Sequence, residues 1–267
     1  MGKYFGTDGF RGEANVTLTV DHAFKVGRFL GWYYGKNHED GKAKIVIGKD
    51  TRRSSYMFEY SLVAGLTASG ADAYLLHVTT TPSVSYVART EDFDCGIMIS
   101  ASHNPFYDNG IKLINAAGEK MKEDVIAEIE KYLDGELGEI PYATRENIGC
   151  TVDYTAGRNR YMGYLMSLAI YSFKGIRVGL DASNGSAWTL AKAVFDALGA
   201  KTYVRNAERD GTKINEKSGS TNREGLKELV RREHLEEGFA WEGDEERCLW
   251  EDEKGEVITF NHILYIY

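Results

Sequence analysis

The sequence has few cysteines and no long apolar run, and each shortage excludes a class of protein. Its three cysteines, Cys95, Cys150 and Cys248, are odd in number and widely spaced, which argues against a disulfide framework and a zinc site. No stretch has the roughly 20 apolar residues that span a bilayer. The start Met1–Gly6 lacks the apolar core of a secretory signal. We therefore expect a protein of the reducing cytoplasm with no membrane partner.

The sequence also lacks an excess of positive charge. It carries 32 Lys and Arg residues against 40 Asp and Glu residues, for a net charge of −8. This balance argues against general binding to nucleic acid. A hydrophobic share of 43% with 27% charged residues is typical of a globular protein, and 267 residues are enough for two ordinary domains.

Short apolar runs alternate with helical patterns along the chain, which is typical of layered α/β folds. The first helix is predicted to begin after an N-cap at Thr19, and Thr81-Pro82 opens another. The polar, turn-rich stretch 135–149 predicts a domain boundary. Strands are predicted at 44–48, 73–76, 95–99 and 111–114 before it, and at 177–180, 201–204, 238–241, 248–250 and 257–258 after it.

A polar loop, Ser100-Ala101-Ser102-His103-Asn104-Pro105, follows the predicted strand 95–99. Open α/β sheets bind ligands at the carboxyl ends of their strands, so this position favours a site. The loop can present the Ser102 hydroxyl beside the His103 imidazole and several backbone N–H donors that suit a phosphate oxyanion. The alternative is a plain turn, because catalytic Ser–His pairs are rarely adjacent in sequence.

An acidic turn, Glu242-Gly243-Asp244-Glu245-Glu246-Arg247, places three carboxylates at alternate positions around a glycine. Oxygen ligands of this kind suit Mg²⁺. Arg247 can clamp a phosphoryl group. The competing interpretation is a solvated acidic turn, continuous with the acidic residues at 236–237 and 251–253.

A third segment near the N-terminus, Phe5–Gly12, reads FGTDGFRG. Its glycines permit close backbone approach, and Arg11 offers a bidentate fork for phosphate. An ordinary β-turn accounts for the same pattern. Neither the dinucleotide fingerprint nor the P-loop pattern is present, so the sequence gives no support for nucleotide binding.

Together, these segments resemble the α-D-phosphohexomutase family. FGTDGFRG, ISASHNP with NGIKL, and the acidic turn occur in the family's order, and LDASNGSA and INEKSGSTN are similar to its bacterial phosphoglucosamine mutase branch. The resemblance covers the first two of the family's four domains. It implies two tandem three-layer α/β domains with mixed sheets, here 1–150 with a phosphoserine loop and 151–267 with a metal-binding loop.

The resemblance implies an isomerase that moves a phosphoryl group between the 6- and 1-positions of a hexosamine phosphate. Ser102 would carry the phosphoryl group, and a bisphosphate would form and turn over in the site. His103, Lys112, Arg247 and Arg11 match residues that line the transfer site. Lys112 and Arg247 are our candidates for proton handling and charge stabilisation.

The same resemblance implies Mg²⁺ as the cofactor. Its ligands would be a phosphoryl oxygen on Ser102 and the carboxylates of Glu242, Asp244 and Glu246. Family members carry Asp-Gly-Asp-Ala-Asp-Arg here, so two of the ligands are one methylene longer and Glu245 adds a negative charge. Because Mg²⁺ tolerates geometric error poorly, we expect weakened binding.

Two other functions stay open at this point. The altered turn and the apolar segment Ile263–Tyr267 favour a non-catalytic or engineered two-domain scaffold, with the apolar segment as a surface for self-association. The second open function is a metal-dependent phosphatase, in which water attacks the phosphoserine. With only two of four domains, we expect impaired or absent mutase turnover, because remote phosphate contacts orient the substrate.

Overall fold

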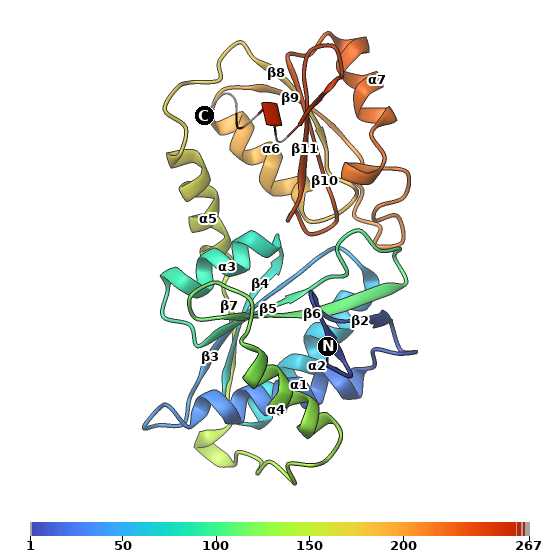
Figure 1. Cartoon of the computed structure of the whole chain (residues 1–267). Helices are drawn as coiled ribbons and strands as arrows, with labels where there is room; N and C mark the ends of the chain where they lie inside the picture. The colour runs from blue at the N-terminus through green and yellow to red at the C-terminus, as the bar shows by residue number, and fades with distance from the viewer. Residues whose placement is uncertain (1, 260, 263, 265–267) are drawn as a thin grey trace.

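The computed structural model describes residues 2–259, 261–262 and 264, which form two sheets with helices packed against them (Figure 1). The first sheet has the strand order β1-β2-β6-β5-β3-β4-β7. It is mixed, because β3, β4, β5 and β7 are parallel whereas β6 and β2 run antiparallel to their neighbours. Its strands are β1 (Phe5–Gly6), β2 (Gly9–Glu13), β3 (Lys44–Lys49), β4 (Asp72–Val78), β5 (Cys95–Ile99), β6 (Asp108–Asn115) and β7 (Thr151–Asp153).

Helices cover both faces of the first sheet. One face holds α1 (Val20–Gly35), α2 (Arg53–Ala68) and α4 (Glu123–Leu133), and the other holds α3 (Thr81–Thr90) (Figure 1). Thr19 caps α1 as predicted, since its hydroxyl accepts the backbone N–H of His22 at 3.3 Å. The helices α1 and α2 pack so closely that a Cβ at Gly65 would lie 2.2 Å from the carbonyl oxygen of Phe24.

The second sheet has the strand order β12-β11-β10-β8-β9 and is also mixed. The helices α6 (Ala187–Ala197) and α7 (Glu224–Glu233) lie on its two faces. A further helix, α5 (Thr155–Ser167), packs on both α3 and α6 and so joins the two units. The strands are β8 (Arg177–Asp181), β9 (Lys201–Arg205), β10 (Glu237–Trp241), β11 (Cys248–Glu251) and β12 (Val257–Ile258).

The predicted α/β class is confirmed, and the division between the units stays a proposal. The predicted boundary after Cys150 falls just before β7, whose residues pair in parallel with β4 of the first sheet. We therefore propose that the division follows Asp153. The stretch 135–149 before it is packed against the first unit, where the buried guanidinium of Arg28 donates to the carbonyl oxygens of Ile140 and, at 3.2 Å, Pro141.

Two observations bear on the expected partners. Within the residues that the structure describes, no helix is long and apolar enough to cross a membrane. The apolar segment Ile263–Tyr267 lies outside the described residues except for Leu264. Self-association through that segment therefore stays a prediction.

Candidate active site

The Ser102 loop follows β5 and is held by side chains from both units. Ser102 is fully buried and adopts a left-handed backbone conformation with φ of 54°. Its backbone N–H donates to Ser100 Oγ at 2.9 Å. Its carbonyl oxygen accepts from Arg52 Nη2 at 3.0 Å and from Asn215 Nδ2, in the second unit, at 2.8 Å. A φ above zero is costly for serine, so these contacts maintain a conformation that the chain would otherwise avoid.

Arg52 is itself fixed by a buried ion pair. Its Nε lies 2.9 Å from Asp50 Oδ2, and both side chains are fully buried. The same guanidinium donates to the carbonyl oxygen of Asn104 at 2.9 Å. The loop that carries Ser102 therefore rests on a rigid cation at the carboxyl end of β3.

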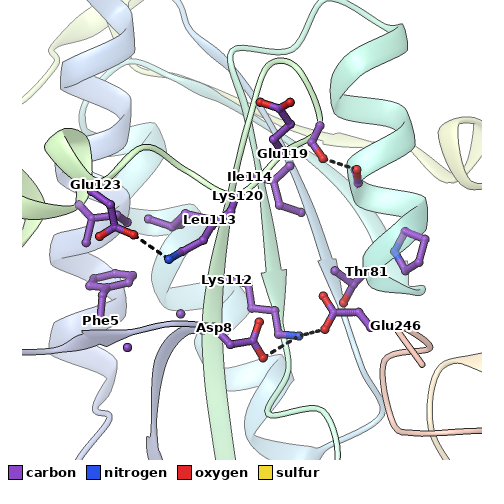
Figure 2. Close-up of a pocket in the computed structure, with 16 residues that line it drawn as sticks. Phe5, Asp8, Thr81, Lys112, Leu113, Ile114, Glu119, Lys120, Glu123 and Glu246 are labelled. Carbon is purple, nitrogen blue, oxygen red and sulfur yellow. Dashed lines mark hydrogen bonds and ion pairs between the residues drawn. The ribbon is translucent and has the colours of Figure 1, made fainter. Parts of the chain in front are cut away.

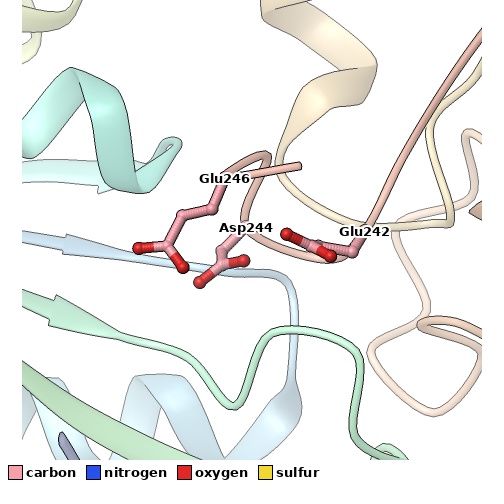
Figure 3. Close-up of side chains that lie close together, drawn as sticks. All are labelled: Glu242, Asp244 and Glu246. Carbon is pink, nitrogen blue, oxygen red and sulfur yellow. The ribbon is translucent and has the colours of Figure 1, made fainter. Parts of the chain in front are cut away.

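The acidic turn between β10 and β11 brings three carboxylates together (Figure 3). Glu242, Asp244 and Glu246 each offer an oxygen atom, and these atoms lie within 4.8 Å of one another. Glu242 and Asp244 are buried. Oε1 of Glu242 and Oδ1 of Asp244 accept no hydrogen bond from the described residues, whereas Oε2 of Glu242 lies 2.7 Å from Arg247 Nε. Buried oxygens without donors, on three converging carboxylates, fit a hard divalent cation.

Lys112, on β6, connects the first unit to this cluster. Its Nζ lies 2.7 Å from Asp244 Oδ2. It also lies 2.7 Å from Glu246 Oε2 and 3.6 Å from Asp8 Oδ2, the two contacts that Figure 2 marks. Burial alone would lower the pKa of Lys112, but the carboxylates of Asp244 and Glu246 outweigh burial and raise that pKa. Burial opposes ionisation of Asp244 too, yet Lys112 lowers the pKa of that carboxyl below its usual value. The pair is therefore ionised at neutral pH.

Arg247 is the group that brings the second unit to the Ser102 hydroxyl. Its Nη2 lies 3.3 Å from Ser102 Oγ and donates to His103 Nδ1 at 2.6 Å, while its Nε lies 2.7 Å from Glu242 Oε2. Burial, and then the positive charges of Arg247 and Arg11, lower the pKa of His103. The imidazole is therefore neutral at pH 7.

An open cleft lies beside these groups. Arg11, on β2, donates to the carbonyl oxygen of Ala101 and to Asn104 Oδ1, both at 3.4 Å, and pairs with Asp8. The cleft has a volume of about 780 Å³, and a neighbouring cavity of about 320 Å³ extends from Lys112 along β6 (Figure 2). Volumes of this order accommodate a sugar phosphate. The cleft is lined by Gly2, Lys3, Tyr4, Gly6, Thr7, Asp8, Gly9, Arg11, His103, Glu246 and Arg247.

The structure thus brings together all the predicted site residues and adds some that sequence reasoning missed. Thr81 was predicted only as a helix start, but its Oγ1 donates to Asp244 Oδ2 at 3.0 Å and its backbone N–H to the Asp244 carbonyl oxygen at 2.9 Å. Asp8 lies in the FGTDGFRG segment, and its negative charge was the one sequence feature that could have indicated a place in the site. For Arg52 and Asn215 no local pattern marks a contact with Ser102.

Glu245 does not join the carboxylate cluster. Its side chain lines a separate apolar cavity of about 420 Å³ between α5 and α6, together with residues such as Tyr161 and Trp241. Burial, and to a lesser degree the charge of Asp244, raise the pKa of Glu245 to about 8. The extra negative charge expected from the sequence is therefore largely suppressed at pH 7.

Comparison with known proteins decides the family. Residues 2–137 match the family model described as "Phosphoglucomutase/phosphomannomutase, alpha/beta/alpha domain I". The chain belongs to this phosphohexomutase family. Two curated relatives named phosphoglucosamine mutase, from Lachnospira eligens and Lachnoclostridium phytofermentans, are 92% and 69% identical to it, and each alignment covers the whole chain. The chain spans 59% of the length of each relative.

Solved structures of phosphohexomutases have the same fold. A phosphoglucomutase/phosphomannomutase family protein from Burkholderia thailandensis matches 96% of this chain and 56% of its own, with a TM-score of 0.81 at 23% sequence identity. A phosphomannomutase-like protein from Thermus thermophilus matches 97% of this chain and 59% of its own, with a TM-score of 0.79 at 22% identity. The predicted α/β class with mixed sheets, of the phosphohexomutase type, is confirmed.

Proposed function

We propose that this chain carries the phosphoryl-transfer centre of a phosphoglucosamine mutase. A phosphoryl group on Ser102 passes to one hydroxyl of a hexosamine phosphate, and the bisphosphate returns its other phosphoryl group to Ser102, which exchanges the 6- and 1-positions. One observation carries the proposal: a buried serine hydroxyl, fixed in a left-handed turn, lies 3.3 Å from an arginine of the opposite unit. The family and the names of the two relatives support it.

Each cation of the site has a task in this proposal. Lys112 and Arg247 stabilise the negative charge that the phosphoryl oxygens gain during transfer. Lys112 acts from a buried position, where such interactions are strong, and Arg247 acts from an exposed position beside the Ser102 hydroxyl. Arg11, at the mouth of the cleft, holds a substrate phosphate through its planar fork. His103, kept neutral, accepts the proton of a sugar hydroxyl at Nδ1 once Arg247 Nη2, which donates to that atom in the free site, has turned to the phosphoryl group.

The carboxylate cluster is the place for Mg²⁺. Glu242, Asp244 and Glu246, together with a phosphoryl oxygen on Ser102, would hold the ion. The buried Oε1 of Glu242 and Oδ1 of Asp244, which have no donor among the described residues, fit that purpose. When bound, the ion neutralises charge on the phosphoryl group. Weakened affinity from the two longer side chains stays a prediction.

The proposal is limited to phosphoryl exchange at Ser102, because the relatives are longer than this chain. Contacts that orient the far end of a substrate raise turnover strongly, and we expect this length of chain to isomerise its substrate slowly or not at all. We assign the reaction to the cytoplasm, because Cys95, Cys150 and Cys248 are all free thiols.

Mass spectrometry of the intact chain tests the proposal. After incubation with a hexose 1,6-bisphosphate and Mg²⁺, we expect one added phosphoryl group, located on Ser102. Ser102→Ala should remove it, whereas Ser167→Ala, which changes an exposed serine of α5, should keep it. A folded wild-type chain that gains no phosphate on Ser102 would refute the proposal. Release of inorganic phosphate from sugar phosphates would instead indicate the phosphatase.

A further inference from the structure

A second pocket lies at the seam between the two units and shares no lining residue with the Ser102 cleft. Its volume is about 320 Å³, which is at the small end of the range for small-molecule sites. The first unit and the second unit each contribute four of its lining residues. They are Thr51, Tyr56, His77 and Val78 from the first unit and Arg158, Trp188, Thr189 and Arg209 from the second.

The fold places this pocket where α/β proteins hold ligands. The parallel neighbours β3 and β4 end at Lys49 and Val78, and the pocket is built on their carboxyl ends. A register shift between the two strands puts His77 opposite Gly48, with a φ of 60°. A hydrogen bond joins the two units beside the pocket, because Thr51 Oγ1 donates to the carbonyl oxygen of Asn184 in the second unit at 2.6 Å.

The charges of the lining residues are all of one sign. Among the described residues, no carboxylate lies within ion-pair distance of Arg158 or Arg209, although the protein has a net charge of −8. Arg158 makes one long hydrogen bond, from Nη1 to the Val78 carbonyl oxygen at 3.4 Å. The guanidinium of Arg209 lies 4.2 Å from the ring centroid of Trp188. His77 Nε2 already faces Asp153 Oδ1 at 3.5 Å, so the two guanidiniums without a counter-ion are the groups that would bind an anion.

The rest of the lining suits an organic group attached to that anion. Trp188 and Tyr56 offer aromatic surface, and Thr189 offers a hydroxyl. Sugar and aromatic rings pack well against such side chains. We propose that this pocket binds a small phosphorylated metabolite about the size of a hexose phosphate. Arg158 and Arg209 bind its phosphoryl group, and Trp188 contacts its organic part. This binding is independent of phosphoryl transfer at Ser102.

Fluorescence and calorimetry of the intact chain test this proposal. The chain is titrated at low salt with inorganic phosphate and, separately, with glucosamine 6-phosphate. We expect a saturable change in fluorescence that Trp188→Phe removes, and tighter binding of the sugar phosphate. Arg158→Gln and Arg209→Gln should each weaken binding roughly 10- to 100-fold, the usual effect of losing a charged hydrogen bond. Arg160→Gln, which removes an equal charge from the same helix, should not.

The Ser102 cleft also attracts phosphates, so the controls must separate the two sites. Arg11→Gln changes the cleft alone and should leave the Trp188 signal intact. Arg209 is exposed on a loop, so Arg209→Gln is expected to fold normally, which circular dichroism checks. The proposal is overturned if no saturable signal appears, if Arg209→Gln binds as tightly as the wild type, or if Arg11→Gln abolishes the signal. Equal affinity for both ligands overturns the contact with the organic part.

Discussion

Replacing Lys112 with methionine tests how the two units are held together at the candidate active site. Methionine keeps the apolar stem but removes the ammonium that lies 2.7 Å from Asp244 and 2.7 Å from Glu246. At that distance and an effective dielectric constant of about 20, each pair attracts by about 6 kcal/mol, much of which desolvation offsets. Asp244 is fully buried and would keep the hydroxyls of Thr81, at 3.0 Å, and Ser102 as side-chain donors among the described residues. We expect a loss of about 3–5 kcal/mol in the free energy of unfolding.

Urea denaturation, followed by tryptophan fluorescence and circular dichroism at pH 7, measures this loss. Lys120→Met is the matched control, because Lys120 is exposed and, within the part of the chain that the structure describes, its ion-pair partner is Glu123 at 2.8 Å. Such a surface pair contributes at most about 1 kcal/mol. If Lys112→Met unfolds within 1 kcal/mol of the wild type, then the cation does not compensate the buried Asp244 carboxylate, and the reasoning about the site's charges is wrong.

Three further predictions concern other polar side chains. Arg28→Met should lower the free energy of unfolding by about 3 kcal/mol, because the guanidinium donates to four oxygens; a urea midpoint equal to the wild type's contradicts this. Burial raises the pKa of Glu251 to about 7, so wild-type stability should fall more steeply from about pH 4.5 to pH 7 than that of Glu251→Gln, in which Glu245 still titrates. Melting temperatures of both proteins at pH 5 and pH 8 check this prediction. A decrease of the same size in both proteins would refute it. Asn215→Ala should slow phosphorylation of Ser102 about tenfold in a mass-spectrometric time course, whereas an unchanged rate would show that its amide does not position the loop.

The elements that the sequence predicted are those with strong local signals. The helix α1 has a threonine cap and a regular apolar face, and β3 and β5 are short continuous apolar runs. The sequence indicated the paired strands β1 and β2 only as a glycine-rich segment. The strands are two and five residues long, which is too short to show a periodicity, and their place in the sheet depends on the pairing of β2 with the distant β6. Likewise β7 is a three-residue strand that only β4 defines.

The residues of the candidate site also fall into those that local sequence patterns predicted and those that they did not. Ser102 and the three carboxylates stand in short motifs whose chemistry can be read locally. Thr81, Arg52 and Asn215 make contacts that depend on how the two units dock, and residue type alone does not reveal such contacts. The donation from Asn215 to Ser102 joins residues that are 113 positions apart, which no spacing rule reaches.

The two longer carboxylates of the acidic turn each have a cation beside them, and this bears on Mg²⁺ binding. Glu246 contacts Lys112, and Glu242 contacts Arg247, so a metal ion competes with charges already in place. A phosphoryl group on Ser102 adds a charge of about −1.5 to −2 next to the same cluster. That charge favours the divalent ion, so affinity for Mg²⁺ should be weak for the unmodified chain and markedly tighter after phosphorylation. Calorimetric titration of the two forms measures the difference. Equal affinities would mean that Ser102 does not share its phosphoryl oxygens with the carboxylate cluster.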